Sequence, residues 1–203
     1  MNLPNKITLT RILMIPVFIA VFYCGLLTPW CYLASAVVFL VAALTDALDG
    51  HIARSRHLIT DLGKFLDPIA DKVLVMAAFI VMLTIPTAFT VAPFGMYGLI
   101  VAGVLIALVL ARELIVSGFR IIAAGKKVVL AADKLGKIKT VSQDISIALL
   151  LVAMSLLRYG LAGEIVAYAG IAVFVFCSLM TVISGINYLV KNKAVLKDEG
   201  ENS

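Results

Sequence analysis

Four aspartates at regular spacing stand out in an otherwise apolar chain. Asp46 and Asp49 are three residues apart, and Asp67 and Asp71 are four residues apart. On an α-helix, either spacing places the two side chains of a pair on one face. If a short polar link joins two such helices, the pairs can face each other, and their mutual repulsion is costly unless cations neutralise it. Because Mg²⁺ and Mn²⁺ prefer carboxylate oxygens, the sequence predicts a two-metal carboxylate site.

A purely structural role explains these aspartates less well. The helix dipole favours an acid at a helix N-terminus, which would suit Asp61 or Asp67. Asp46 and Asp49 instead fall near the C-terminal end of an apolar stretch, where the dipole disfavours anions. Charged residues within membrane spans are costly and usually face a functional cavity, so a functional role is the better interpretation.

Small residues accompany the first pair of acids. Gly50 and Ala53 follow Asp46 by four and seven residues, and Arg54 comes directly after them. Small side chains permit close approach by a neighbouring helix or by a flat ligand. Arg54 can bind a phosphate through two parallel hydrogen bonds. Helix packing alone remains an alternative for Gly50, but beside the acids we favour a ligand slot.

The composition is that of an integral membrane protein. Of the 203 residues, 63% are hydrophobic and 14% are charged, and the mean hydropathy is +1.10. Long apolar runs are candidates for transmembrane helices. We therefore predict an all-α fold in a single membrane domain, residues 1–203, with six transmembrane helices. The expected spans run to about Gly25, then over Trp30–Arg54, Gly63–Ile85, Phe94–Ala123, Ile138–Leu157 and Gly163–Val190.

Both ends of the chain are more polar than the spans. Residues 2–11 are expected to form a short amphipathic segment near the membrane surface, with Asn5, Thr8 and Arg11 on one polar side. This segment is expected to continue into the first span, and it does not resemble a cleaved signal peptide. Residues 191–203 form a charged tail, and a basic loop is expected over residues 125–137.

The distribution of Lys and Arg residues predicts the orientation in the membrane. Six spans would place all Lys and Arg residues except Arg158 on the side of the two termini, which orients that side and the acidic motif toward the cytoplasm. The net charge of +5 then reflects topology and anionic lipid rather than nucleic acid, for which no basic–aromatic pattern is present. Cys24, Cys31 and Cys177 lack metal-ligand spacing. A disulfide between Cys24 and Cys31 is left open, although plain apolar roles are favoured.

The full motif resembles the signature of the CDP-alcohol phosphatidyltransferase family. Eight specified residues match at fixed spacings: Asp46, Asp49, Gly50, Ala53, Arg54, Gly63, Asp67 and Asp71. The similarity extends over most of the chain. Three further stretches, which match less specifically than the central motif, favour members of the family that use a glycerol phosphate acceptor. They are residues 3–11, 111–120 and 135–140.

The resemblance implies transfer of a phosphatidyl group from CDP-diacylglycerol to sn-glycerol 3-phosphate, in a homodimer at the cytoplasmic membrane. It implies that Asp46, Asp49, Asp67 and Asp71 bind two divalent cations, Mg²⁺ or Mn²⁺. It also implies that Asp71 is the general base, a role that suits a carboxylate beside a weakly nucleophilic alcohol. The nucleotide site implied by the resemblance comprises Asn5, Thr8, Asp46, Gly50, Ala53, Arg54, Thr60 and Gly63.

A phosphorylated acceptor needs a second cationic pocket, and four basic residues are candidates for it. Arg112 and Arg120 are eight residues apart and so lie on nearly the same helix face, whereas Arg112 and Glu113 are expected to point differently. In the alternative, Arg112 pairs with an internal acid such as Asp144, and the lysines contact lipid headgroups. The candidates are Arg112, Arg120, Lys137 and Lys139.

Three rival functions remain open. Within the family, the acceptor could be inositol phosphate, serine or phosphatidylglycerol, although the basic residues favour a phosphorylated one. A membrane prenyltransferase also uses aspartate pairs and Mg²⁺, but its motifs are ordinarily separated and lack the Gly-x-x-Ala-Arg insertion. A divalent-cation carrier would place acids near mid-membrane on several helices, whereas these four cluster at one end.

Overall fold

The computed structural model describes residues 3–55, 61–126 and 134–192. Within these ranges, side chains are described except at residues 3–8, 46–55, 61–69, 71, 124 and 134–135. The described chain is helical. Its elements are α1 (Leu3–Cys24), α2 (Trp30–Ser55), α3 (Asp61–Thr84), the short 3₁₀ helix η1 (Pro86–Ala88), α4 (Gly95–Gly125), α5 (Lys134–Leu156), the 3₁₀ helix η2 (Leu157–Tyr159) and α6 (Leu161–Lys191).

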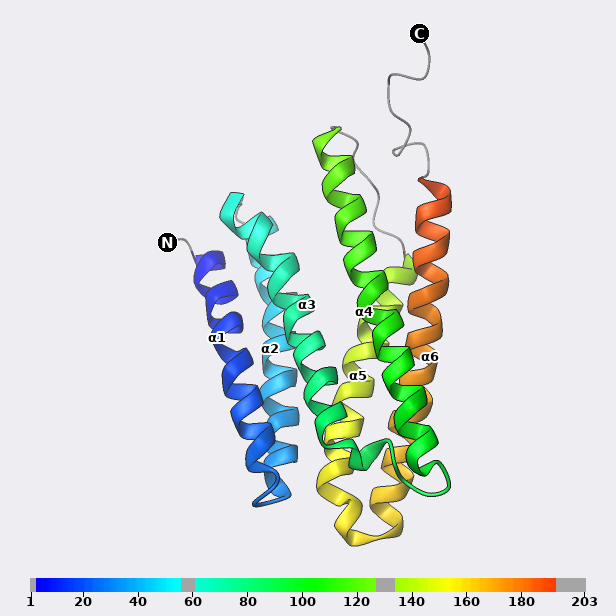
Figure 1. The fold of residues 1–203 in the computed structure, drawn as a ribbon. Helices are drawn as coiled ribbons and strands as arrows, with labels where there is room; N and C mark the ends of the chain where they lie inside the picture. The colour runs from blue at the N-terminus through cyan, green and yellow to red at the C-terminus, as the bar shows by residue number, and fades with distance from the viewer. Residues whose placement is uncertain (1–2, 56–60, 127–133, 193–203) are drawn as a thin grey trace.

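The six long helices form an up-and-down bundle. Successive helices run in opposite directions, so the start of α1 and the end of α6 lie at the same end (Figure 1). Helices α1, α2 and α3 form one side of the bundle, and α4, α5 and α6 form the other (Figure 1). α1 packs on α2 and α3, while α5 packs on α6 and α2. Helix α5 therefore joins the two sides.

The helices agree closely with the predicted spans, with one correction. The basic loop was expected to end at Lys137, but α5 already begins at Lys134. Residues 134–139 read Lys-Leu-Gly-Lys-Ile-Lys, so basic residues are interspersed with uncharged ones. That pattern is compatible with a helix that starts outside the hydrocarbon. The expected lead-in segment is part of one continuous helix that includes Pro16.

Three of the described helical stretches are long and apolar enough to cross a membrane: Gly95–Ala123, Gly136–Tyr159 and Leu161–Lys191. Shorter apolar stretches occupy the other long helices, at Leu9–Cys24, Trp30–Thr45 and Lys72–Thr84. The protein is thus a helical membrane protein, and the count of six spans stays a prediction.

The surface of this bundle differs from that of a water-soluble protein. Large apolar side chains such as Leu13, Ile80 and Ile121 are exposed on the outside, whereas Ser178 and Thr181 are buried. An outward apolar surface of this extent needs an apolar solvent. Small polar residues inside the bundle allow close helix contact and bond to backbone carbonyls. This distribution independently supports a lipid environment.

An aromatic cluster in the core fixes α3 against α6. The ring of Phe174 lies 5.5 Å from that of Phe79 and 5.5 Å from that of Phe89, measured between centroids. Tilted aromatic pairs at this separation add to packing beyond their buried area. Because α3 carries two of the four aspartates, this cluster helps to set the position of the acidic end.

Candidate active site

All four aspartates lie on helices that meet at one end of the bundle. Asp46 and Asp49 fall in the last turns of α2, and Asp67 and Asp71 fall in the first half of α3. Residues 56–60 join the two helices and lie outside the described residues. The acidic ends of α2 and α3 therefore lie at the same end as the start of α1 (Figure 1). The side chains of the four aspartates are not among those described, so the predicted metal cluster stays a prediction.

The predicted nucleotide residues occupy the same end of the bundle. Gly50, Ala53 and Arg54 belong to the last turns of α2, and Gly63 to the first turn of α3. Thr60 lies outside the described residues. The remaining candidates, Asn5 and Thr8, lie in the opening turns of α1, which packs on both α2 and α3.

Arg11 was not among the predicted site residues, although the structure buries it at this end of α1. It follows Thr8 by three residues and is only 1% exposed. Burial of a guanidinium is costly unless it interacts with other groups, and Arg11 does interact with a neighbour. A basic residue inside an apolar stretch was the available sequence signal.

Arg112 is held inside the bundle by two helices. Its Nη1 donates to Glu113 Oε1 over 3.1 Å, and its Nη2 donates to Ser184 Oγ over 2.9 Å. The prediction that Arg112 and Glu113 point differently did not include this pair: adjacent residues leave a helix in different directions, but the long arginine side chain still reaches its neighbour's carboxylate. Arg112 does pair with an internal acid, as the alternative interpretation held, and that acid is Glu113.

Lys139 converges on the same carboxylate. It is buried, and its Nζ donates to Glu113 Oε1. Contact with lipid headgroups is therefore ruled out for Lys139. Two of the four predicted acceptor residues, Arg112 and Lys139, are thus brought together on α4 and α5 by a glutamate to which the sequence assigned no role.

A lysine connects this cluster to the acidic helix. Lys72 directly follows Asp71 on α3, and its Nζ donates to Ser117 Oγ on α4. Ser117 Oγ in turn donates to the backbone carbonyl of Glu113. The turn of α3 that bears Asp71 therefore lies against the turn of α4 that bears Glu113.

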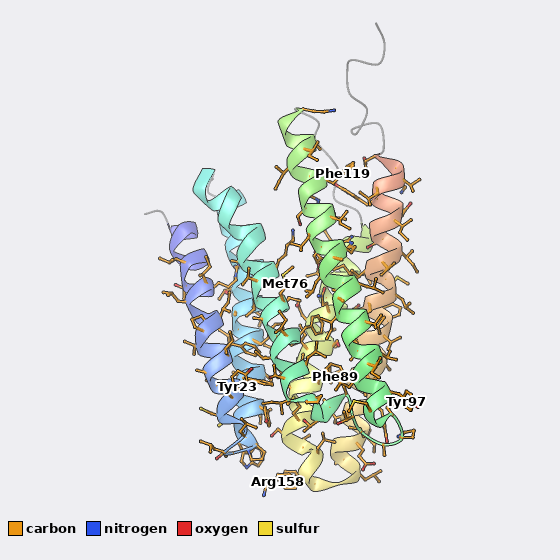
Figure 2. The ribbon with its side chains drawn as sticks, viewed as in Figure 1. Tyr23, Met76, Phe89, Tyr97, Phe119 and Arg158 are labelled. Atoms are coloured by element: carbon orange, nitrogen blue, oxygen red, sulfur yellow. The ribbon has the colours of Figure 1, made fainter. Side chains whose placement is uncertain are left out.

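A small polar pocket marks the junction of α3, α4 and α5. Its volume is about 20 Å³, enough for one water molecule or one phosphate oxygen but not for a whole glycerol phosphate. Met76 lies between α3 and α4 at this level (Figure 2). The lining residues are Lys72, Val75, Met76, Leu110, Glu113, Lys139, Thr140 and Gln143.

A larger pocket lies far from this chemistry. Its volume is about 290 Å³, and it is lined by apolar and aromatic residues of α4, of α6 and of the segment between η1 and α4, among them Phe89, Tyr97 and Phe174. Phe89 and Tyr97 lie toward the end of the bundle opposite the aspartates (Figure 2). Its lining has no charged group that could act on a phosphate, so it is not the candidate active site.

The other two predicted acceptor residues do not join the Glu113 cluster through any contact that the structure describes. Arg120 donates from Nε to Tyr188 Oη over 3.3 Å, and its guanidinium carbon lies 5.4 Å from the centroid of that ring. Lys137 is exposed on the first turn of α5. Arg120 is thus held against α6, about two turns farther toward the end of α4 than Arg112.

Comparisons with known proteins identify the family to which the sequence is similar. A family model described as "CDP-alcohol phosphatidyltransferase" matches residues 1–194. A Bacillus subtilis protein is 40% identical over 97% of this chain and 97% of its own length, and an Escherichia coli K12 protein is 36% identical over 98% of each. A Salmonella paratyphi A relative is 34% identical over 98% of each chain. All three relatives are called CDP-diacylglycerol–glycerol-3-phosphate 3-phosphatidyltransferase.

Proposed function

The chain belongs to the CDP-alcohol phosphatidyltransferase family, and we propose that it transfers the phosphatidyl group of CDP-diacylglycerol to sn-glycerol 3-phosphate. The products are phosphatidylglycerophosphate and CMP. The observation that carries this proposal is the agreement in name of relatives that are 34–40% identical over almost the whole chain. The pairing of two cations, Arg112 and Lys139, inside the bundle supports a phosphorylated acceptor.

The four aspartates fit a pair of divalent cations, Mg²⁺ or Mn²⁺. Asp46 and Asp49 would bind from α2, and Asp67 and Asp71 from α3. Two observations support this: the backbone brings all four residues to one end of two adjacent helices, and carboxylate oxygens are the ligands that these hard ions prefer. Bound there, the cations would neutralise the diphosphate of the donor and stabilise the departing CMP.

Proton transfer and nucleotide binding would be carried out by the protein's own side chains. Asp71 would accept the proton of the acceptor hydroxyl, because an alcohol attacks poorly until a base receives that proton. Gly50 and Ala53 would let the nucleotide approach the α2 backbone, and Arg54 would hold a phosphate oxygen. The other proposed nucleotide contacts are Asn5, Thr8, Asp46, Thr60 and Gly63.

The acceptor phosphate would bind to the cations of α4 and α5. Arg112 and Lys139 are the stronger candidates, since Lys139 is buried, Arg112 is largely enclosed, and both meet at one carboxylate. Arg120 and Lys137 would contribute nearer the membrane surface, where both are exposed.

Replacement of Arg112 by alanine tests the acceptor site. We expect the KM for glycerol phosphate to rise by roughly 10–100-fold, as loss of a hydrogen bond to a charged group predicts. The KM for CDP-diacylglycerol should change by less than about twofold, because the nucleotide is bound by other helices. Steady-state kinetics in detergent–lipid micelles measure both constants. Equal changes in the two would remove Arg112 from the acceptor pocket.

We also propose that all six long helices span the membrane and that the acidic end faces the cytoplasm. Arg158 lies at the opposite end of the bundle (Figure 2). Near it, the rings of Trp30 and Tyr159 lie 6.2 Å apart and are exposed, as expected of aromatic residues at a membrane–water interface. A homodimer is supported by the family resemblance alone, and light scattering on the purified protein would measure it.

The release of CMP tests both the reaction and the side of the membrane on which the active site lies. Purified protein is given CDP-diacylglycerol and, in turn, glycerol 3-phosphate, inositol phosphate, serine or phosphatidylglycerol, and CMP release is followed. We expect release only with glycerol 3-phosphate, in a one-to-one ratio with the lipid product. In sealed vesicles, external glycerol phosphate should react when the membrane is inverted but not when it is right side out. Release with a different alcohol would reassign the acceptor within the family.

A further inference from the structure

Three residues closely surround the side chain of Arg112. Glu113 and Ser184 accept hydrogen bonds from its two terminal nitrogens, over 3.1 and 2.9 Å. Gly185 packs against the stem of the arginine side chain. A Cβ added there would lie 2.6 Å from Arg112 Cγ and 2.9 Å from Arg112 Nε. Only glycine at position 185 therefore leaves room for the arginine in this position.

Glu113 does more than neutralise one charge. Its Oε1 atom accepts from Arg112 and from Lys139, so one carboxylate lies between two cations that would otherwise repel each other. Both cations keep further N–H groups for another ligand, since a guanidinium has five donors and an ammonium has three. Arg112 Nε is buried and has no hydrogen-bond partner among the described residues.

We propose that Glu113, Ser184 and Gly185 are positioning residues for the acceptor phosphate. They hold Arg112 and Lys139 at a fixed separation before glycerol phosphate binds, and they do not themselves contact it. Donors that are already in place bind an anion without the cost of ordering flexible side chains. The inference rests on the proposed function, because it requires Arg112 and Lys139 to bind the acceptor phosphate.

A structural role for this ion pair is the competing explanation. A buried glutamate could simply compensate the charges of two neighbouring cations, and its loss would then destabilise the bundle and weaken the binding of both substrates alike. The two explanations differ in which KM changes. Positioning predicts a change confined to glycerol phosphate, whereas compensation predicts a lower melting temperature with parallel changes in both substrates.

The decisive variant is Gly185→Ala, which removes no charge and no hydrogen-bonding group. The added methyl must displace the Arg112 stem, and a displacement of about 1 Å can cost up to ~10²-fold in activity. We expect the KM for glycerol phosphate to rise by roughly 10–100-fold, with the KM for CDP-diacylglycerol within about twofold of wild type. The inhibition constant of inorganic phosphate, measured against glycerol phosphate, should rise in parallel.

The same helix offers a matched control. A Cβ at Gly170 would lie 3.1 Å from Leu150 Cδ2 and 3.2 Å from the Leu150 backbone nitrogen, so Gly170→Ala also crowds α6 but approaches no charged side chain. This control should leave the ratio of the two KM values unchanged. Equal behaviour of Gly185→Ala and Gly170→Ala in both KM values would overturn the positioning role.

Two further variants keep the test valid if Gly185→Ala does not fold. Glu113→Gln retains the shape of the side chain but loses its charge, and it should raise the same KM selectively. Ser184→Ala should have a smaller effect in the same direction, and Ser184→Thr should restore the wild-type value because it keeps the hydroxyl. Ser178→Ala is the control for the serine, since Ser178 Oγ bonds only within α6, to the carbonyl of Phe174.

The Arg112→Ala variant separates the two proposals. If it raises the glycerol phosphate KM while Gly185→Ala and Glu113→Gln do not, the acceptor site stands and the positioning role is wrong. If Arg112→Ala leaves that KM unchanged, the acceptor site itself is wrong, and the positioning role falls with it.

Discussion

Asp71→Asn is expected to lower kcat by roughly 10²–10⁴-fold, the usual contribution of a general base, while the folded protein still binds CDP-diacylglycerol. The amide retains the size of the carboxylate but cannot accept the hydroxyl proton. Its weaker interaction with a divalent cation should add to the loss. Single-turnover release of CMP measures the chemical step, and retention of a labelled donor lipid on the purified variant measures binding.

Asp61→Asn is the matched control for this experiment. It makes the same chemical change on the same helix, ten residues earlier and outside the eight positions of the family signature. We expect its kcat to lie within about twofold of wild type, since a first-turn acid stabilises a helix by only ~0.3–1 kcal/mol. Wild-type turnover by Asp71→Asn would refute the assignment of the base.

Removal of divalent cations should abolish the reaction. Four carboxylates at one end of α2 and α3 cannot hold a polyanionic diphosphate without cations between them. EDTA is expected to reduce CMP release to background, and Mg²⁺ or Mn²⁺ should restore it. Asp46→Asn should raise the metal concentration needed for half-maximal activity by at least ~10-fold, because even the loss of an outer partner of a metal ligand costs 10–100-fold in affinity.

Glu164→Gln is the control for the metal titration. Glu164 lies in the first turn of α6, at the end of the bundle opposite the aspartates, so its loss removes one negative charge without touching the acidic cluster. Its metal requirement should equal that of wild type. Full activity in EDTA would contradict the metal-assisted mechanism.

The sequence predicted the helices well, and it placed the four aspartates on two helices that meet at one end, because both features depend on local patterns. Apolar runs bounded by polar residues define spans closely, and spacings of three and four residues define a helix face wherever the helix lies. The one misplaced boundary, the start of α5 at Lys134 instead of Ile138, occurs where charged residues can continue a helix beyond the hydrocarbon.

The cation cluster could be predicted only in part. Arg112 and Lys139 were predicted because a phosphorylated acceptor needs cations, but their common partner was not predicted. Adjacent residues on a helix point about 100° apart, so periodicity separates Arg112 from Glu113, and only the tertiary packing of α5 brings Lys139 to the same oxygen atom. The role of Gly185 likewise depends on which side chain of α4 crosses α6, and no local pattern reports that.

The contacts of Lys72 suggest how the two halves of the site keep their register. Lys72 follows Asp71 and bonds to Ser117, which bonds to the backbone of Glu113. A shift of α3 along α4 would break this connection and would move the base relative to the acceptor cations. The reaction needs the hydroxyl at the base and the phosphate at the cations at the same time, and a direct connection between these helices serves that requirement.

The most direct test of the central claim is a count of bound metal ions. Electron paramagnetic resonance of Mn²⁺ titrated into the purified protein with CDP-diacylglycerol gives the number of ions per chain. We predict two ions for the wild type and weakened or missing binding in Asp46→Asn and in Asp67→Asn, one variant from each helix. Undiminished binding of both ions in either variant would contradict the claim that carboxylates of α2 and α3 hold the cations together.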